Sequence, residues 1–154
     1  MSLPIENLAA FRDKFEEVVQ SLLAPEDSVP QQIVDYTLAF DEIFLAGENL
    51  HKVPKLKRIL RQLEPHGPGN AKPVFNSSNV HVRDARLLKD AHLKLVLTQP
   101  GTNVHIDAIG FNMADKYELV QSGEPLEILY TLETNTWRDL ETLQLNLKDI
   151  RASL

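Results

Sequence analysis

Cations, amides and one tryptophan are the side chains of this sequence whose types and spacing could do chemistry. The candidates fall in two short stretches and on one later segment: Arg86, Lys89, His92, Lys94, Asn135, Trp137, Arg138 and Gln144. Proteins that hold single-stranded nucleic acid combine cations, which pair with phosphates, with aromatic rings on which bases stack. Amide side chains add hydrogen bonds to bases or sugars. We therefore expect these residues to form a nucleic-acid-binding surface.

The sequence contains no comparable set of residues that could catalyse a reaction. The histidines occur singly, without the paired spacing of metal ligands: His51, His66, His81, His92 and His105. There is no cysteine, no Gly-rich phosphate loop and no histidine-assisted nucleophile. We expect neither a catalytic residue nor a metal or other cofactor in this chain.

Charge and composition favour a soluble domain from a reducing compartment. The net charge is −6, which argues against a broad basic footprint for nucleic acid. One local exception lies between His51 and Arg61, where Lys52, Lys55, Lys57, Arg58 and Arg61 occur without an acid. This cluster is either a solvated helix face or a contact for an acidic partner. No apolar run approaches the length of a membrane span, so we expect a cytoplasmic protein with no membrane partner.

The candidates are positioned by a run of predicted strands. Alternating apolar residues predict strands in His92–Thr98 and from Val104, and one long bent strand over Val74–Leu88 with an irregularity at Asn76–Asn79. "NMADKYELV" predicts a short helix capped by Asn112. Two later strands, "EPLEILYTLET" and "TLQLNLKDI", place leucines, Ile128 and Tyr130 inward. Phe75, Phe111 and Tyr130 are expected in the core.

The order of these elements is strand, strand, strand, helix, strand, strand. This is the order of an OB-fold, a five-stranded Greek-key barrel that often binds oligonucleotides. We therefore predict a mainly β protein, of α+β class through its helical N-terminal extension. In the extension, helical spacing runs from Pro4 to Leu23 and from Pro54 to Leu63, and Ile33–Phe40 is readable as a strand. The second helix is expected to bury Leu56, Ile59, Leu60 and Leu63.

The stretch "LEPHGPGNAKPVF", residues 63–75, separates the two parts. Pro65 cannot continue a helix, and Gly67 and Gly69 permit positive φ angles. Asn70 can hydrogen-bond its own backbone. We expect Pro65, Gly67, Gly69 and Asn70 to form a rigid structural connector. The predicted organisation is a helical segment over residues 1–62, a connector over 63–73 and an OB-fold domain over 74–154.

Several of these segments resemble the RecJ family of bacterial single-strand-specific DNA exonucleases, within the DHH phosphoesterase superfamily. "LEPHGPGNAKPVF" is close to the family signature LEPFGxGNPxPxF, and "LPIENLAAFRDKFEEVV" is similar to the helix that closes the DHH-associated domain. "HLKL", "AIGF" and "YTLETNTW" through "LQLNLKDI" match barrel segments in order. His66 replaces the family's aromatic residue, and Arg138-Asp139 replaces its Asn-Gly turn.

The resemblance implies a C-terminal part of such an exonuclease, with residues 1–62 ending the DHH-associated domain. It implies a parent enzyme that degrades single-stranded DNA from the 5′ end in repair and recombination, using Mn²⁺ or Mg²⁺. This chain has no Asp-His-His run, so we expect it to be non-catalytic by itself. The expected partners are single-stranded DNA, the remainder of the parent nuclease and a single-strand-binding protein.

Alternatives remain open for individual residues and for the whole module. Trp137 either stacks a base or folds back over the barrel end, and Lys94 either binds phosphate or is simply solvated. His92 has the alternative of a polar pair with His105 or Asp107. For the module, the alternative is protein docking through outward acids: Asp107, Glu127, Glu133 and Glu141.

Overall fold

The computed structural model describes residues 33–44 and 47–154. The helix predicted from Pro4 to Leu23 lies outside these residues. Strands dominate the described part: β1 (Tyr36–Thr37), β2 (Phe75–Leu88), β3 (His92–Thr98), β4 (His105–Gly110), β5 (Leu126–Trp137) and β6 (Leu140–Ala152). The helices are short: α2 (Phe40–Ile43), α3 (Lys55–Leu60) and α4 (Tyr117–Gln121), with 3₁₀ turns η2 (Arg61–Leu63) and η3 (Ala114–Lys116).

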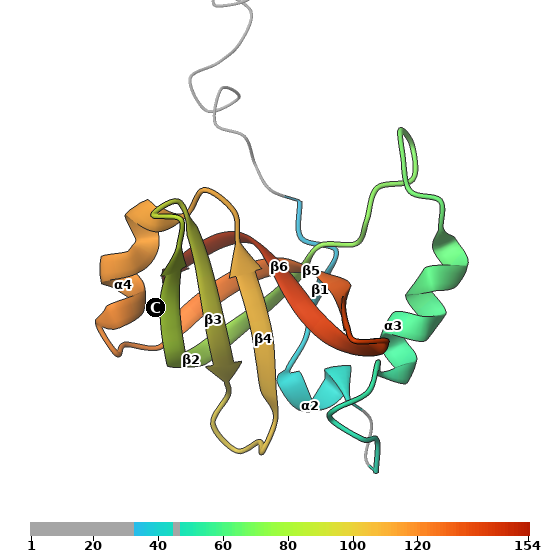
Figure 1. The fold of residues 1–154 in the computed structure, drawn as a ribbon, viewed down its shortest axis with the longest axis horizontal. Helices are drawn as coiled ribbons and strands as arrows, with labels where there is room; N and C mark the ends of the chain where they lie inside the picture. The colour runs from blue at the N-terminus through green and yellow to red at the C-terminus, as the bar shows by residue number, and fades with distance from the viewer. Residues whose placement is uncertain (1–32, 45–46) are drawn as a thin grey trace, which may run out of the picture. The chain divides into compact units, whose positions relative to one another are not determined.

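The strands form one sheet that closes on itself. Their order is β1-β2-β3-β4-β6-β5, and β2 also pairs with β5. The pairs β4–β6 and β1–β2 are parallel, and the remaining pairs are antiparallel. Figure 1 shows the barrel between α4 and α3. With a helix between β4 and β5, this is the predicted OB-fold. No helix in the described residues is long and apolar enough to span a membrane.

Strand β2 closes the barrel by pairing with both β5 and β3. Its first half pairs with β5 and its second half with β3. The change of partner coincides with a register shift between Ser77 and Val80, where Asn79 has φ 55°. The predicted irregularity over Asn76–Asn79 is therefore confirmed, and it lets one long strand bend around the barrel.

Alternating apolar side chains fill the interior, as predicted. Buried residues on the four long strands and β4 include Phe75, Leu93, Leu95, Leu97, Ile106, Leu126, Ile128, Tyr130, Leu132, Leu143, Leu145 and Leu147. One prediction for the core was wrong. Phe111 is 52% exposed, because Met113 from the same turn packs against the core instead.

The segment before α3 differs from its prediction. Only Tyr36 and Thr37 of the expected strand Ile33–Phe40 pair with β2. Gln99 then accepts a hydrogen bond from the N–H of Phe40, which begins α2. Phe40, Ile43 and Phe44 join the barrel's hydrophobic core. The assignment of residues 1–62 to a preceding domain stays a prediction.

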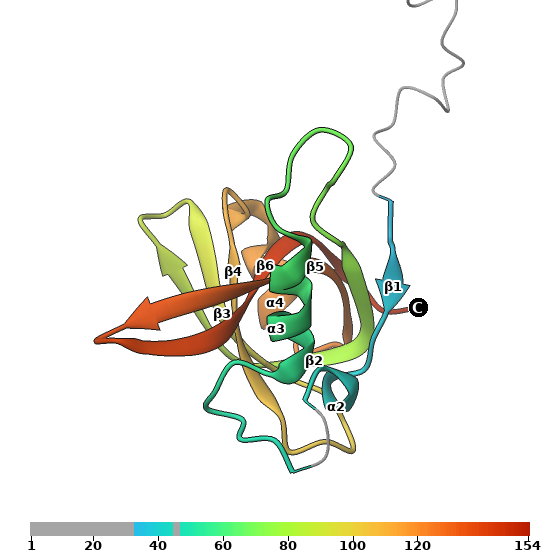
Figure 2. The same ribbon diagram turned by 90° about the vertical axis from the view of Figure 1, so that its right-hand side faces the viewer.

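Helix α3 turns a different side to the barrel from the one predicted. Leu56 and Leu60 pack against the core, whereas Ile59 and Leu63 are exposed. Lys57 is only 6% exposed, so the basic cluster is not a uniformly solvated face. Arg61 bonds Glu141 and Thr134 on the β5–β6 hairpin, and this contact holds α3 across the end of the barrel (Figure 2).

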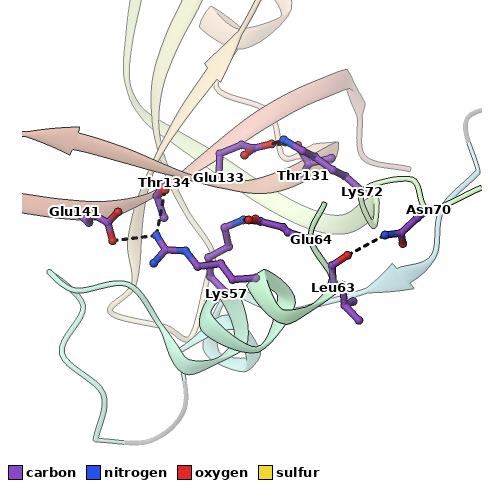
Figure 3. Close-up of polar contacts among 10 residues, drawn as sticks. Lys57, Leu63, Glu64, Asn70, Lys72, Thr131, Glu133, Thr134 and Glu141 are labelled. Atoms are coloured by element: carbon purple, nitrogen blue, oxygen red, sulfur yellow. Dashed lines mark hydrogen bonds and ion pairs between the residues drawn. The ribbon is translucent and has the colours of Figure 1, made fainter. Parts of the chain in front are cut away.

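The connector folds over its own hydrogen bonds. The side-chain amide of Asn70 donates to the carbonyl oxygen of Leu63 at 2.8 Å (Figure 3). It also donates to the carbonyl oxygen of Pro65 at 2.9 Å. Gly69 has φ 77°, which explains glycine at that position. His66 is half-buried and, with Leu60 and Phe75, lines a void of about 10 Å³, which holds at most one water.

The turn before α4 also departs from prediction. Asn112 caps no helix with its side chain: it has φ 55°, and its backbone N–H donates to Nδ1 of His92. Met113 occupies the cap position of η3 and makes no side-chain cap bond. The helix itself lies near the expected place and contributes Val120 to the core.

Candidate nucleic-acid interface

The exposed side of β2, β3, β4 and β6 forms a continuous surface, called here the outer face. Its members on β3, β4 and β6 alternate with buried neighbours, whereas the neighbours of its two members on β2 are exposed or half-buried. The members are Asp84, Arg86, Lys94, Val96, Asp107, Ile109, Gln144 and Asn146. The register places Arg86, Lys94, Ile109 and Asn146 in one row across the sheet. The adjoining row is Asp84, Val96, Asp107 and Gln144.

Two cations stand side by side on the outer face. Arg86 of β2 is the direct register partner of Lys94 of β3. Nε of Arg86 lies 3.0 Å from Oδ2 of Asp84, so part of its charge is already compensated. Lys94 is exposed and makes no ion pair with any residue that the structure describes. Of the two cations, Lys94 therefore has the less compensated charge.

Lys89 and His92 lie at one end of this face. Lys89 occupies the β2–β3 turn with φ 51°, and its side chain is exposed. His92 begins β3 and stacks edge-on against Phe111, with ring centroids 5.3 Å apart. Its Nδ1 accepts the N–H of Asn112. The strand register places His105 opposite Thr98 and Asp107 opposite Val96, so His92 does not form the polar pair with either residue.

Trp137 and its neighbours lie apart from this face, at the tip of the β5–β6 hairpin. The indole is 70% exposed, so it does not fold back over the barrel end. The guanidinium of Arg138 lies 5.6 Å from the ring centroid, a cation–π distance. Arg138 and Asp139 form the two-residue turn with φ 48° and 61°, and Asn135 pairs with Thr142 further down the hairpin.

The structure therefore divides the predicted site residues between two places. Arg86, Lys94 and Gln144 share the outer face, with Lys89 and His92 at its end, whereas Asn135, Trp137 and Arg138 belong to the hairpin. Phe111 was missed as a surface residue. Its local signal was available, because the polar residues Asn112 and Asp115 follow it closely.

Three of the four acids proposed for protein docking are engaged within the chain. Glu133 bonds Lys72, Glu141 bonds Arg61, and Glu127 bonds Arg151. The hydrogen bonds from Arg151 and Asn76 lower the pKa of Glu127 below its ordinary value. Only Asp107 of the four makes no ion pair among the described residues.

A hollow of about 190 Å³ adjoins the outer face near the end of β3. It is lined by Phe44, Leu50, His51, Val96, His105, Ile106, Asp107, Thr142 and Leu143. His51 and His105 contribute polar groups at its rim. Over the described residues, no three histidine, aspartate or glutamate side chains come close enough to hold a metal ion. The residues present there do not fit the Mn²⁺ or Mg²⁺ implied for the parent enzyme.

Comparison with known families settles the type of barrel. A family model described as the RecJ OB domain matches residues 35–149. The chain belongs to this family. The sequence resemblance is thereby confirmed, and the match begins before β1. This RecJ OB domain includes α2 and α3 within the matched residues.

Relatives of the RecJ OB domain share modest identity over nearly its whole length. The single-stranded-DNA-specific exonuclease RecJ of Bacillus subtilis is 25% identical over 155 residues, covering 99% of this chain and 18% of that protein. RecJ of Salmonella typhimurium is 25% identical over 150 residues, covering 97% and 24%. The chain thus spans about a fifth of the length of these relatives.

Solved structures show the same fold. RecJ from Thermus thermophilus in complex with Mn²⁺ superimposes with a TM-score of 0.67 at 19% identity, covering 100% of this chain and 20% of that chain. The complex with Mg²⁺ gives a TM-score of 0.66 at 19% identity, covering 99% and 21%. At 19% identity these two structures show only that the RecJ OB domain shares their fold.

Proposed function

We propose that this RecJ OB domain binds single-stranded DNA across its outer face. In this proposal it is a cytoplasmic, non-catalytic module of a metal-dependent exonuclease that degrades single strands from the 5′ end in repair and recombination. The remainder of the parent protein supplies the metal ions and the hydrolysis. The relatives' name, single-stranded-DNA-specific exonuclease, supports the choice of ligand.

The observation that carries the proposal is the pairing of Arg86 with Lys94. Neighbouring strands of a sheet lie about 5 Å apart, so two adjacent cations can contact one or two successive phosphates. Gln144 and Asn146, further across the same face, offer hydrogen bonds to bases or sugars. The hairpin carrying Trp137 is a second contact, reached by a longer strand.

The test is a fluorescence-anisotropy titration of a labelled single-stranded oligonucleotide with the 154-residue chain, at two salt concentrations and with duplex as a comparison. Each phosphate contact contributes about 0.7 to the slope of log affinity against log salt for single strands. Lys94→Glu is expected to weaken binding and reduce this slope. Lys55→Glu is the matched control, since Lys55 is exposed on α3 and belongs to no strand of the outer face. Absence of binding at low salt would contradict the proposal.

The second candidate is docking onto the nuclease core or a single-strand-binding protein. The outward acids give this candidate little support, because Glu127, Glu133 and Glu141 form ion pairs within the chain. The exposed Ile59 and Leu63 on the outer side of α3 and η2 are what favour it. Partner binding abolished by Ile59→Ser, without DNA affinity in the unchanged domain, would support docking instead.

A further inference from the structure

Phe111 is an aromatic side chain that the barrel presents to solvent. It follows the last residue of β4 and is 52% exposed. Its ring meets His92 edge-on, with a centroid distance of 5.3 Å and an interplanar angle of 71°. An exposed phenylalanine braced by a second ring has a face available for a flat ligand.

Met113 explains why Phe111 is not part of the core. The thioether packs against the core cluster, and it lies directly over Gly110. A Cβ atom at Gly110 would come within 2.8 Å of Sδ of Met113, so glycine at this position lets the methionine approach the strand closely. Met113 thus fills the space that Phe111 would otherwise take.

Two hydrogen bonds fix the turn that carries Phe111. The N–H of Asn112 donates to Nδ1 of His92 at 3.0 Å, and the N–H of Ala114 donates to the carbonyl oxygen of Ala91 at 3.2 Å. Because Nδ1 accepts this bond, Nε2 is the ring nitrogen that is left to donate. The two rings are therefore held in place before any ligand arrives, and less entropy is lost on binding.

Cations adjoin the two rings on the outer face. Lys94 lies two residues along β3 from His92, and so on the same side of the strand. Its register partner on β4 is Ile109, which precedes Phe111 by two residues. On the other side, Lys94 is paired with Arg86. A flat apolar surface thus stands beside positive charge, the combination that single-strand binders use.

We propose that Phe111, braced by His92, is a stacking platform for one nucleobase of a single strand whose phosphates contact Lys94 and Arg86. The platform rests on the proposed function and adds to it a residue and a mode of contact. A nucleotide matches both the aromatic surface and the adjacent positive charge, because its flat base is joined through the sugar to an anionic phosphate. Stacking is tolerant of sequence, so the platform favours unpaired bases without selecting among them.

The experiment compares two oligomers of equal length and charge: oligothymidylate and an abasic deoxyribose-phosphate strand. Phe111→Ala is expected to weaken binding to oligothymidylate roughly 5- to 150-fold, the range that one stacked base is worth. Binding to the abasic strand and the salt slope should not change. Phe111→Leu, which keeps apolar bulk, should lose nearly as much, and Phe111→Tyr should retain affinity.

A spectroscopic readout separates stacking from a general loss of structure. In a Phe111→Trp, Trp137→Phe double variant the single indole stands on the platform, and oligothymidylate should quench its fluorescence while the abasic strand should not. Equal affinity of Phe111→Ala and the unchanged domain would overturn the platform alone, provided that Lys94→Glu still weakens binding. Failure of the unchanged domain to bind either oligomer would overturn the platform and the proposed function together.

Discussion

Nζ of Lys72, in the connector, lies 2.7 Å from Oε1 of Glu133 on β5 (Figure 3). Burial alone would raise the pKa of this carboxyl, but the hydrogen bond and charge of Lys72, with the charge of Lys57, more than compensate. The pKa of Glu133 therefore lies below its ordinary value of 4.5. Through this pair the residues between α3 and β2 are tied to β5, the strand with which the start of β2 pairs.

Acid should weaken this attachment. A carboxyl with a lowered pKa in the folded state stabilises the fold above its unfolded pKa of about 4.5, and the contribution disappears as pH falls through the folded value. We expect Lys72→Met to unfold more easily than the unchanged chain at pH 7, with the difference narrowing below pH 4.5. Urea titrations of both proteins at pH 7 and pH 3 measure this difference in the free energy of unfolding. Lys55→Met, on exposed Lys55, is the control, and a gap independent of pH would contradict the prediction.

Alkali should act through Tyr130. Burial raises the pKa of its hydroxyl to about 12. Since the unfolded pKa is about 10, the neutral phenol stabilises the fold below pH 10, and this contribution is lost between pH 10 and pH 12. Tyr130→Phe should show a shallower fall in stability over that window, measured by urea unfolding. A parallel fall in both proteins would refute it.

The hydroxyls of Tyr130 and Ser77 also allow the costs of two substitutions to be ranked. Ser77 donates to the carbonyl oxygen of Leu38 at 2.6 Å and accepts from Tyr130, so it serves two partners. Tyr130→Phe should cost about 1 kcal/mol, whereas Ser77→Ala leaves a buried phenol and a carbonyl unpaired and should cost about 2 kcal/mol. Equilibrium unfolding at pH 7 gives both values. The reverse order would show that the network is not arranged this way.

One substitution in the turn of the β5–β6 hairpin should stabilise the fold. Arg138 and Asp139 both have positive φ, the conformation of a type I′ turn, which glycine adopts without steric cost. Asp139→Gly should raise the free energy of unfolding by about 0.5 to 1 kcal/mol. Glu124→Gly, at an exposed position without positive φ, should lower it or leave it unchanged. Thermal denaturation of both variants tests whether the two signs differ.

Asp84 should restrain binding on the outer face. Its carboxylate compensates Arg86 at 3.0 Å, so Asp84→Asn frees the guanidinium for phosphate. We expect a severalfold gain in affinity for oligothymidylate at low salt and a steeper salt slope. The double variant Asp84→Asn, Arg86→Ala should lose that gain. An unchanged slope in the single variant would place the bound strand away from Arg86.

Alternation along single strands predicted much of the barrel. Strand β3 has the bounds His92–Thr98 that its alternating leucines indicated, and Leu143, Leu145 and Leu147 are buried as expected. Period-2 patterns are reliable here because each strand has one face in the core, and a shift of one residue would expose every leucine.

Packing choices that no single strand or helix pattern reveals limited the remaining predictions. Phe111 and Met113 are both suitable for the core, and the choice between them depends on the space above Gly110. Likewise, helical spacing did not reveal that Lys57 is buried, because its surroundings include Glu64, Thr131 and Leu132 from other elements. Trp137 lies at the tip of the β5–β6 hairpin and Lys94 on the outer face, and alternation along single strands did not indicate this separation. Their role in binding stays a prediction.

The pairing of β2 with both β3 and β5 has a consequence for the folding rate. Its first half can pair with β5 only after the chain brings together residues as distant as Ser77 and Tyr130, which are 53 positions apart. The parallel pairing of β4 with β6 needs a similar long-range encounter. Chains dominated by such non-local contacts fold on timescales of roughly milliseconds to seconds. Until β2 meets β5, the growing sheet keeps an unpaired edge, and this is the interval in which the chain is most exposed to self-association.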